Sequence, residues 1–383
     1  MKIVLAEPMN DAADKPISPT GGVPLPRSFP KAHCGGASFR ALMDSFFTEL
    51  GKRNVRYLVL RNYETLPDEA TNDVDILVSP NEERQGFDAI KFAAEQTGWA
   101  ISNVGRFSCL SVFLFCPDTL EQTHVDLMPG NRWHSFSFAD DDAMLGRRVP
   151  FKQFFVPAQP DESWISFATR LLYGGYVKRK YRPKIQAVCK EKQAETMSVF
   201  AAILGRRFAR KVVSLCAAGD WDAAESLAGK VRRRTMLLNA VHPFSFSVRV
   251  FHDGLRFLDR FLSPPGLVVG LAGEHVAWRD EADQILRRSL LGTFYPKKTF
   301  RWNVSEGRSL RSRIRKNSFH GGLSIIDIPF APAWMPRCDI IFSDKSIRLG
   351  RCHVFGMEWP DENVIAGTVL EFLRKRTEVR IAR

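Results

Sequence analysis

Two aspartates stand two residues apart in an apolar stretch of this chain, and a third follows further along. Asp73 and Asp75 lie in the segment DVDILV, and Asp126 lies in HVDLM. Because side chains alternate across a strand, Asp73 and Asp75 point to the same side. Neighbouring carboxylates repel unless a proton or a cation lies between them. Mg²⁺ prefers carboxylate and phosphate oxygens, so these residues predict a metal site that holds a phosphorylated substrate.

A solvated strand end after a turn is the alternative explanation for the first two acids. Asn72 and Asp73 are favourable turn residues. Asp126 weighs against this alternative, because it also sits in an otherwise apolar segment and three buried charges without a cation would be costly. The three acids together therefore favour a metal site.

Several other polar residues are candidates near this site. His124 would share the strand face of Asp126, where it acts as a ligand or base or only forms a hydrogen bond. Arg132 and His134 follow the third acid and either contact a substrate or belong to a loop. Three tyrosines among basic residues either stack on a base or lie on an ordinary helix surface: Tyr173, Tyr176 and Tyr181.

Regular hydrophobic patterns predict the elements that position these acids. The expected order is helix, two strands, helix and three strands, which indicates a small mixed sheet covered by helices. The helices are expected at 38–52 and 81–98, and the strands at 57–60, 73–78, 99–104, 109–116 and 122–128.

The remaining chain divides by composition. Residues 1–36 are rich in Pro, Gly and Ser and predict a mobile leader. The first folded domain is expected at 37–158. A helical segment without strand signals is expected at 159–262, and the SPPG sequence at 263–266 opens a final domain at 263–383.

Around the three acids the chain carries a recognisable order of short signals. Leu60–Arg61–Asn62, Tyr63–Glu64 and Leu66–Pro67 precede Asn72–Asp75, and Val125–Asp126–Leu127 comes later. In this order, over roughly residues 38–190, the chain resembles the nucleotidyltransferase-like proteins of bacterial polysaccharide gene clusters. Like them, it has Arg61–Asn62 where most active nucleotidyltransferases have Gly-Ser or Gly-Gly.

The resemblance implies a minimal nucleotidyltransferase fold of the polymerase-beta type. Asp73, Asp75 and Asp126 would hold one or two Mg²⁺ ions against an NTP, and Asp126 would also help activate the acceptor hydroxyl. Two metals can stabilise both the attacking and the leaving oxygen of a displacement at phosphorus. Arg61, with Asn62 beside it, would bind the nucleotide, since a guanidinium pairs well with a phosphate.

The last domain resembles a degenerate thymidylate-kinase-like P-loop domain. Gly266–Leu–Val–Val–Gly–Leu–Ala–Gly273 matches the strand and the first glycines of such a domain. Glu274 to Trp278 then stand where the glycines, Lys and Ser/Thr of the phosphate-binding loop are normally found. Asp327 and Asp339 match the acids of two later strands. We therefore expect a domain that does not hydrolyse ATP, with an unrelated α/β domain as the alternative.

Charge and cysteine content narrow the class of protein. The net charge is +13, which favours anionic partners such as nucleotides, phosphorylated glycans, nucleic acid or an anionic membrane surface. Much of the excess is clustered, at 176–184, 205–211, 230–234 and 308–316. A nucleic-acid recognition motif is lacking, which makes such a partner the weaker alternative. The seven scattered cysteines fit reduced thiols, and no apolar run is long enough for a membrane span.

The sequence thus predicts an α/β (α+β) protein with a nucleotidyltransferase sheet, a helical middle segment and a P-loop-like α/β domain. Its expected activity is Mg²⁺-dependent transfer of an NMP group from an NTP to a phosphorylated or sugar acceptor. The expected setting is polysaccharide biosynthesis in the cytoplasm, with glycan-assembly proteins as partners. A nucleotide-binding sensor or scaffold without turnover is the alternative.

Overall fold

The computed structural model describes residues 34–70, 73–290, 292–294, 298–304, 309–328, 337–344 and 353–381. The chain forms two compact units. One comprises 131–149 and 157–249, and the other comprises the described parts of 30–130, 150–156 and 250–383. We call them the helical unit and the sheet unit. Residues 1–33 of the predicted leader 1–36 lie outside the described residues.

A five-stranded mixed sheet forms the first half of the sheet unit. Its order is β2-β4-β7-β6-β5, and only the β4–β7 pair is parallel. The strands are β2 (Tyr57–Val59), β4 (Asp73–Val78), β5 (Ala100–Arg106), β6 (Leu110–Phe115) and β7 (Gln122–Met128). All five were predicted from short apolar segments bounded by turns, and their existence is confirmed.

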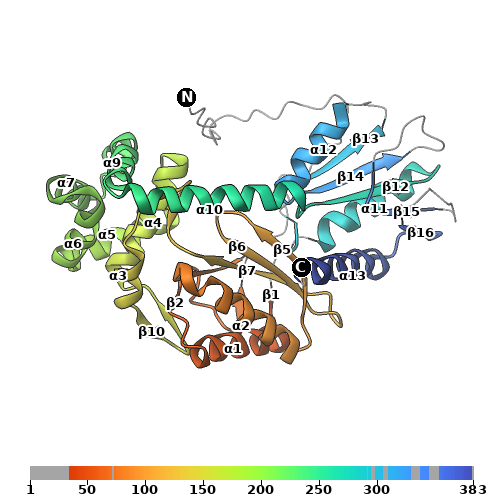
Figure 1. Cartoon of the computed structure of the whole chain (residues 1–383), viewed down its shortest axis with the longest axis horizontal. Helices are drawn as coiled ribbons and strands as arrows, with labels where there is room; N and C mark the ends of the chain where they lie inside the picture. Colours follow the sequence, from red (N-terminus) through yellow and green to blue (C-terminus); the bar gives the residue numbers. More distant parts are fainter. Residues whose placement is uncertain are drawn as a thin grey trace. The chain divides into compact units, whose positions relative to one another are not determined.

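One face of this sheet is covered by α1 (Ala37–Lys52) and α2 (Glu83–Gln96), which lie side by side (Figure 1). The short helix η1 (Pro80–Glu82) precedes α2. Val74, Ile76 and Val125 point into the core that these helices share with the sheet. Because side chains alternate, Asp73, Asp75 and Asp126 stand on the opposite face. Burial of the apolar face therefore determines the face on which the acids lie.

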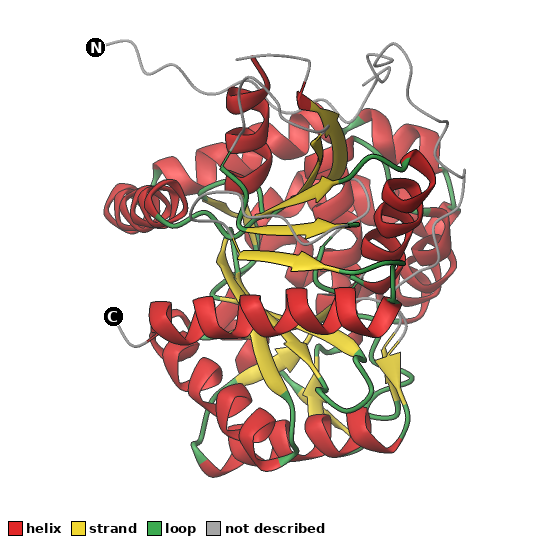
Figure 2. Ribbon diagram, turned by 90° about the vertical axis from the view of Figure 1, so that its right-hand side faces the viewer, coloured by secondary structure: helices red, strands yellow, loops and turns green. Residues whose placement is uncertain are grey.

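A second sheet of five parallel strands follows in the same unit. Its order is β13-β14-β12-β15-β16. Helices α11 (Val276–Ser289) and α13 (Glu362–Ile381) cover one face, and α12 (Ser309–Phe319) covers the other (Figure 1). Figure 2 shows the strands in yellow among the red helices. The strands are β12 (Leu267–Ala272), β13 (Thr299–Asn303), β14 (Leu323–Ile328), β15 (Ile340–Ser343) and β16 (His353–Gly356).

Hydrogen bonds join the two sheets into one unit. The amide of Asn103 on β5 donates to the carbonyl of Pro265 at 2.8 Å. Thr377 on α13 donates to the carbonyl of Ser102 at 3.0 Å, and Gln122 on β7 accepts from Thr293 at 2.8 Å. The first sheet and the C-terminal domain expected from residue 263 therefore pack as one body.

The helical unit contains α3 (Asp141–Gly146), α4 (Gln159–Gly174), η2 (Arg179–Tyr181), α5 (Arg182–Glu191), α6 (Gln193–Leu204), α7 (Arg206–Ala218), α8 (Trp221–Ser226) and α9 (Ala228–Ala240). Its core includes Trp164, Phe167 and Phe200, whose rings pack together. Residues 131–149, expected with the first sheet, pack in this unit. Helix α10 (Pro243–Leu262) continues from the helical unit into the sheet unit.

Short strand pairs complete the described structure. β1 (Cys34–Gly35) pairs with β3 (Glu69–Ala70), β8 (Arg132–Trp133) with β9 (Phe136–Ser137), and β10 (Val149–Phe151) with β11 (Phe154–Val156). The predicted mixed α/β class is confirmed. Among the described residues, every helix is too short or too polar to cross a membrane.

Candidate functional site

Strands β4 and β7 bring the predicted acids together. In their parallel register Asp75 stands beside Asp126, and Asp73 stands beside His124. All four side chains share the sheet face that α1 and α2 leave uncovered. Asp75, Asp126 and His124 are buried and Asp73 is half-buried, so the group opens to solvent at Asp73.

Three of these side chains form a group with the donor atoms of a metal site. One ligand atom each from Asp73, His124 and Asp126 lie within 4.8 Å of one another. Ligands bound ~2.1 Å from a single ion lie at most about 4.2 Å apart, so side-chain shifts below about 1 Å would suffice. Two carboxylates and an imidazole therefore fit a divalent cation. The ring of His124 is held against Phe113, with 5.0 Å between the ring centroids.

The third predicted ligand, Asp75, is paired with a cation of the chain itself. Nε of Arg61 donates to its carboxylate at 2.5 Å, and the Asp75 residue is only 2% exposed. Burial raises the pKa of Asp75, Arg61 lowers it, and the charges of Asp73 and Asp126 raise it again. Arg61, expected to bind phosphate, thus neutralises part of the negative charge on this face.

Asp126 is surrounded by groups from three other segments. Ser111 on β6 donates its hydroxyl to Oδ1 of Asp126 at 2.5 Å. Burial, and then the charge of Asp126, raise the pKa of the neighbouring Cys109 thiol well above its usual range. Burial, and then the charge of Arg260, lower the pKa of Lys298, just before β13, while Cys109 and the charge of Asp126 act on it in the opposite direction. The second sheet therefore contributes a cation to the environment of Asp126.

Other sequence candidates lie elsewhere. Asn62 follows Arg61 with a φ of 53°, a conformation that Asn tolerates better than most residues. In the helical unit, the hydroxyl of Tyr173 donates to the carbonyl of Arg132 at 2.9 Å, and the tilted ring of His134 lies 6.1 Å from the Tyr173 ring, centroid to centroid. Tyr176 is exposed, and Lys180 lies over the ring of Tyr181. None of these residues belongs to the group formed by Asp73, Asp75, His124 and Asp126.

The turn between β12 and α11 is the segment that resembles a phosphate loop. The backbone N–H of Glu274 donates to the carboxylate of Asp344 at 3.0 Å, and that of His275 donates to the same oxygen at 3.4 Å. A Cβ placed on Gly273 would lie 2.6 Å from this carboxylate. A side chain of the protein thus occupies the position at which backbone N–H groups of a P-loop receive a phosphate.

The acids of the later strands are also engaged. Asp327 on β14 forms a two-bond ion pair with Arg301 of β13, at 2.8 and 2.9 Å. Asp339 accepts from the backbone N–H of Val268 at 2.9 Å. These acids stabilise the second sheet, and the expected absence of ATP hydrolysis stays a prediction.

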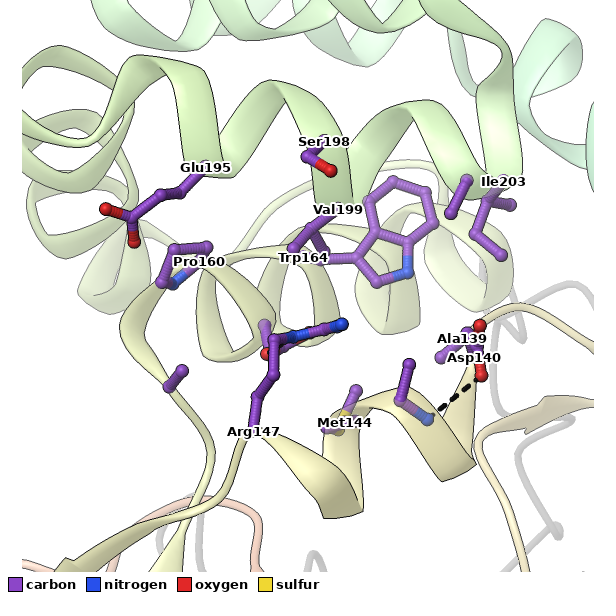
Figure 3. Close-up of a pocket in the computed structure, with 14 residues that line it drawn as sticks. Ala139, Asp140, Met144, Arg147, Pro160, Trp164, Glu195, Ser198, Val199 and Ile203 are labelled. Carbon is purple, nitrogen blue, oxygen red and sulfur yellow. Dashed lines mark hydrogen bonds and ion pairs between the residues drawn. The ribbon is translucent and has the colours of Figure 1, made fainter.

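A cavity of about 260 Å³ lies in the helical unit (Figure 3). Arg147 from the end of α3 and Trp164 from α4 point into it, opposite Glu195 of α6. The Arg147 guanidinium forms two hydrogen bonds with the buried Asp161, at 2.7 and 3.1 Å. The charge of Arg147 is therefore compensated by a carboxylate of the protein itself.

Sequence reasoning missed two groups beside Asp126. Ser111 could have been predicted, because it is a lone hydroxyl in an otherwise apolar strand. Lys298 could not, because more than a hundred residues separate it from Asp126 and only the packing of the two sheets brings it near. Comparisons with protein-family models, curated proteins and solved structures gave no match to this chain.

Proposed function

We propose that this chain is a divalent-metal-dependent nucleotidyltransferase. It would move an NMP group from an NTP to a hydroxyl of a sugar or other acceptor, in polysaccharide production. One observation carries the proposal: the parallel register of β4 and β7 sets Asp75 beside Asp126, with Asp73 on the same face. Arg61 pairs with Asp75, and the carboxylates of Asp73 and Asp126, together with His124, suit a phosphate-bound metal.

Each residue has a role in this proposal. Asp73, Asp126 and His124 would hold the cation, Mg²⁺ being the first candidate. The bound metal would supply neutralisation of the triphosphate charge. Arg61 fixes the orientation of Asp75 through their ion pair. Oδ2 of Asp126, the oxygen that does not accept from Ser111, would take the proton of the acceptor hydroxyl.

The second sheet is proposed to support the site on the first sheet and not to hydrolyse ATP. Its parallel strands place β12 between β14 and β15, and the turn after β12 is the segment that resembles a phosphate loop. Asp344 at the turn after β12 supports the proposal that ATP is not bound there, because a phosphate would have to displace a carboxylate. Lys298 extends this part toward Asp126, where it would add positive charge beside a bound triphosphate.

Labelled NTPs test the activity. The wild-type protein is incubated with each NTP, labelled at either the α- or the γ-phosphate, together with Mg²⁺ and cell extract. NMP transfer moves the α-label to an acceptor and leaves the γ-label in pyrophosphate. Asp73→Asn and Asp126→Asn should abolish the transfer, and Glu95→Gln, which changes an exposed carboxylate on α2, should not. Equal transfer by wild type and both site variants would refute the proposal.

The non-catalytic sensor or scaffold is the second candidate, and the pairing of Asp75 with Arg61 favours it, because one of the three acids is already neutralised. This function predicts Mg²⁺-dependent NTP binding without label transfer. Binding lost in Asp73→Asn, with no transfer by wild type, would establish it.

A further inference from the structure

Helix α10 turns its apolar side toward solvent. Four large side chains are exposed at one-turn spacing along its second half: Phe251 at 64%, Leu255 at 47%, Leu258 at 50% and Leu262 at 73%. Residues spaced by four and three positions lie on one face of a helix. The described part of the chain thus leaves an apolar face uncovered, which marks an interaction surface.

The opposite side of α10 holds the helix on the protein. Arg256 forms an ion pair with Glu83 at 2.5 Å and donates to the carbonyl of Ser108 at 3.0 Å. The Arg260 guanidinium lies 4.6 Å from the centroid of the Phe319 ring. These contacts fix the rotation of the helix about its axis. Turning the apolar face inward would break them, so its exposure is part of the fold.

Basic side chains border the apolar face. Helix α12 lies against the end of α10, with 4.9 Å between the ring centroids of Phe257 and Phe319. The guanidinium of Arg315 lies 4.6 Å from the centroid of the exposed Phe261 ring. Four residues of α12 are basic and exposed: Arg311, Arg313, Arg315 and Lys316. Apolar and cationic groups therefore form one continuous surface, which we call the α10–α12 surface.

The charge of this surface selects its partner. A second copy of this chain would bring the same cations to the contact, and like charges repel within a Debye length of about 10 Å. An anionic lipid bilayer instead attracts the cations and accepts the phenylalanine and leucine side chains below its headgroups. We propose that the α10–α12 surface docks the protein on a membrane that contains anionic lipid, with α10 lying in the plane of the interface.

Vesicle co-sedimentation of the full-length protein tests this proposal. One set of vesicles is phosphatidylcholine alone, and the other contains about 30% phosphatidylserine. Wild type should sediment with the anionic vesicles only, and binding should weaken as NaCl rises from about 0.05 to 0.5 M. The double variant Leu255→Asn/Leu258→Asn should abolish binding. Both positions are exposed, so circular dichroism and thermal unfolding should show a folded protein.

A charge variant and a matched control separate specific docking from general basicity. Arg311→Gln/Arg315→Gln removes two cations from the surface and should weaken partitioning roughly 30-fold, at about 1 kcal/mol for each charge. Lys52→Gln/Lys91→Gln removes the same charge from α1 and α2 and should leave partitioning within about threefold of wild type. Both control lysines are exposed.

Several results would overturn the proposal. One is a wild type that sediments with neither vesicle, or that binds neutral and anionic vesicles equally well. Another is a control pair that weakens binding as much as the α12 pair does. A wild-type dimer in analytical ultracentrifugation that Leu255→Asn/Leu258→Asn dissociates, without any vesicle binding, would assign the surface to a second copy. None of these readouts depends on nucleotidyl transfer.

Discussion

The Arg61–Asp75 ion pair provides a quantitative test of how the acidic face tolerates its charge. Arg61→Met removes the cation and keeps a side chain of similar length. Asp75 would then remain 2% exposed, beside Asp126 in the sheet register and two residues from Asp73. The perturbation leaves a buried carboxylate without its partner, which is the costly way to break such a pair.

The expected loss follows from the exposure of the two partners. Removing one member of a fully buried pair costs about 3–5 kcal/mol. The Arg61 side chain is 27% exposed, so solvent screens part of the interaction and we expect about 2–3 kcal/mol. Asp75→Asn instead removes a charge that its acidic neighbours repel and leaves a cation that water reaches. That single change should cost about 1 kcal/mol or less.

Urea unfolding of the four proteins of the double-mutant cycle measures the coupling. Samples contain EDTA, so that bound metal does not enter the comparison. Arg61→Met/Asp75→Asn should be more stable than Arg61→Met alone, with a coupling energy of about 1.5 kcal/mol or more. A coupling below about 0.5 kcal/mol would refute the view that Arg61 compensates the charge of Asp75.

Three further predictions concern other parts of the fold. Gly266→Ala would place a Cβ 2.4 Å from the Cα of Ser318 and should lower the free energy of unfolding by about 1–3 kcal/mol. The control Gly51→Ala, whose Cβ would have no atom within 4 Å, should change the free energy of unfolding by less than about 1 kcal/mol. Equal denaturation midpoints for the two variants would contradict the clash. Asp344→Ala frees two backbone N–H groups and should cost about 0.5–2 kcal/mol, and added inorganic phosphate should raise the melting temperature of this variant but not of wild type. Burial raises the pKa of Asp141 from 3.8 to about 6 despite hydrogen bonds from Asn131, so its favourable contribution is present below about pH 4 and lost as pH rises through 6. Relative to Asp141→Asn, wild type should lose up to about 3 kcal/mol between roughly pH 4 and 7, and parallel stability curves in urea unfolding would contradict this sign.

The first sheet could be predicted from the sequence because its signals are local. Apolar residues flanking the acids locate β4 and β7, and the two-residue spacing of Asp73 and Asp75 fixes their common face. The His124 position followed from the same alternation. The exact register that sets Asp75 beside Asp126 required the structure, because register depends on packing across strands.

What could not be predicted depends on contacts between distant segments. The carboxylate of Asp344 reaches the turn after β12 from a strand about seventy residues later, a contact that closes only when the second sheet forms. The strand pair β8–β9 was missed, since two-residue strands carry no measurable period. In the sequence, the apolar pattern of α10 is the same as that of a helix whose apolar face is buried in a core. Its exposure follows from the contacts of Arg256 and Arg260 on the other side.

Metal binding tests the central claim most directly. Mn²⁺ is titrated into wild type, Asp73→Asn, Asp126→Asn and the Glu95→Gln control, and the electron paramagnetic resonance signal of free Mn²⁺ reports the unbound ion. Wild type and Glu95→Gln should bind with equal affinity, and each site variant should bind at least about tenfold more weakly, a difference of about 1.4 kcal/mol. Mg²⁺ should displace the bound Mn²⁺. Equal binding by all four proteins, or no binding by wild type, would contradict a metal site at Asp73, His124 and Asp126.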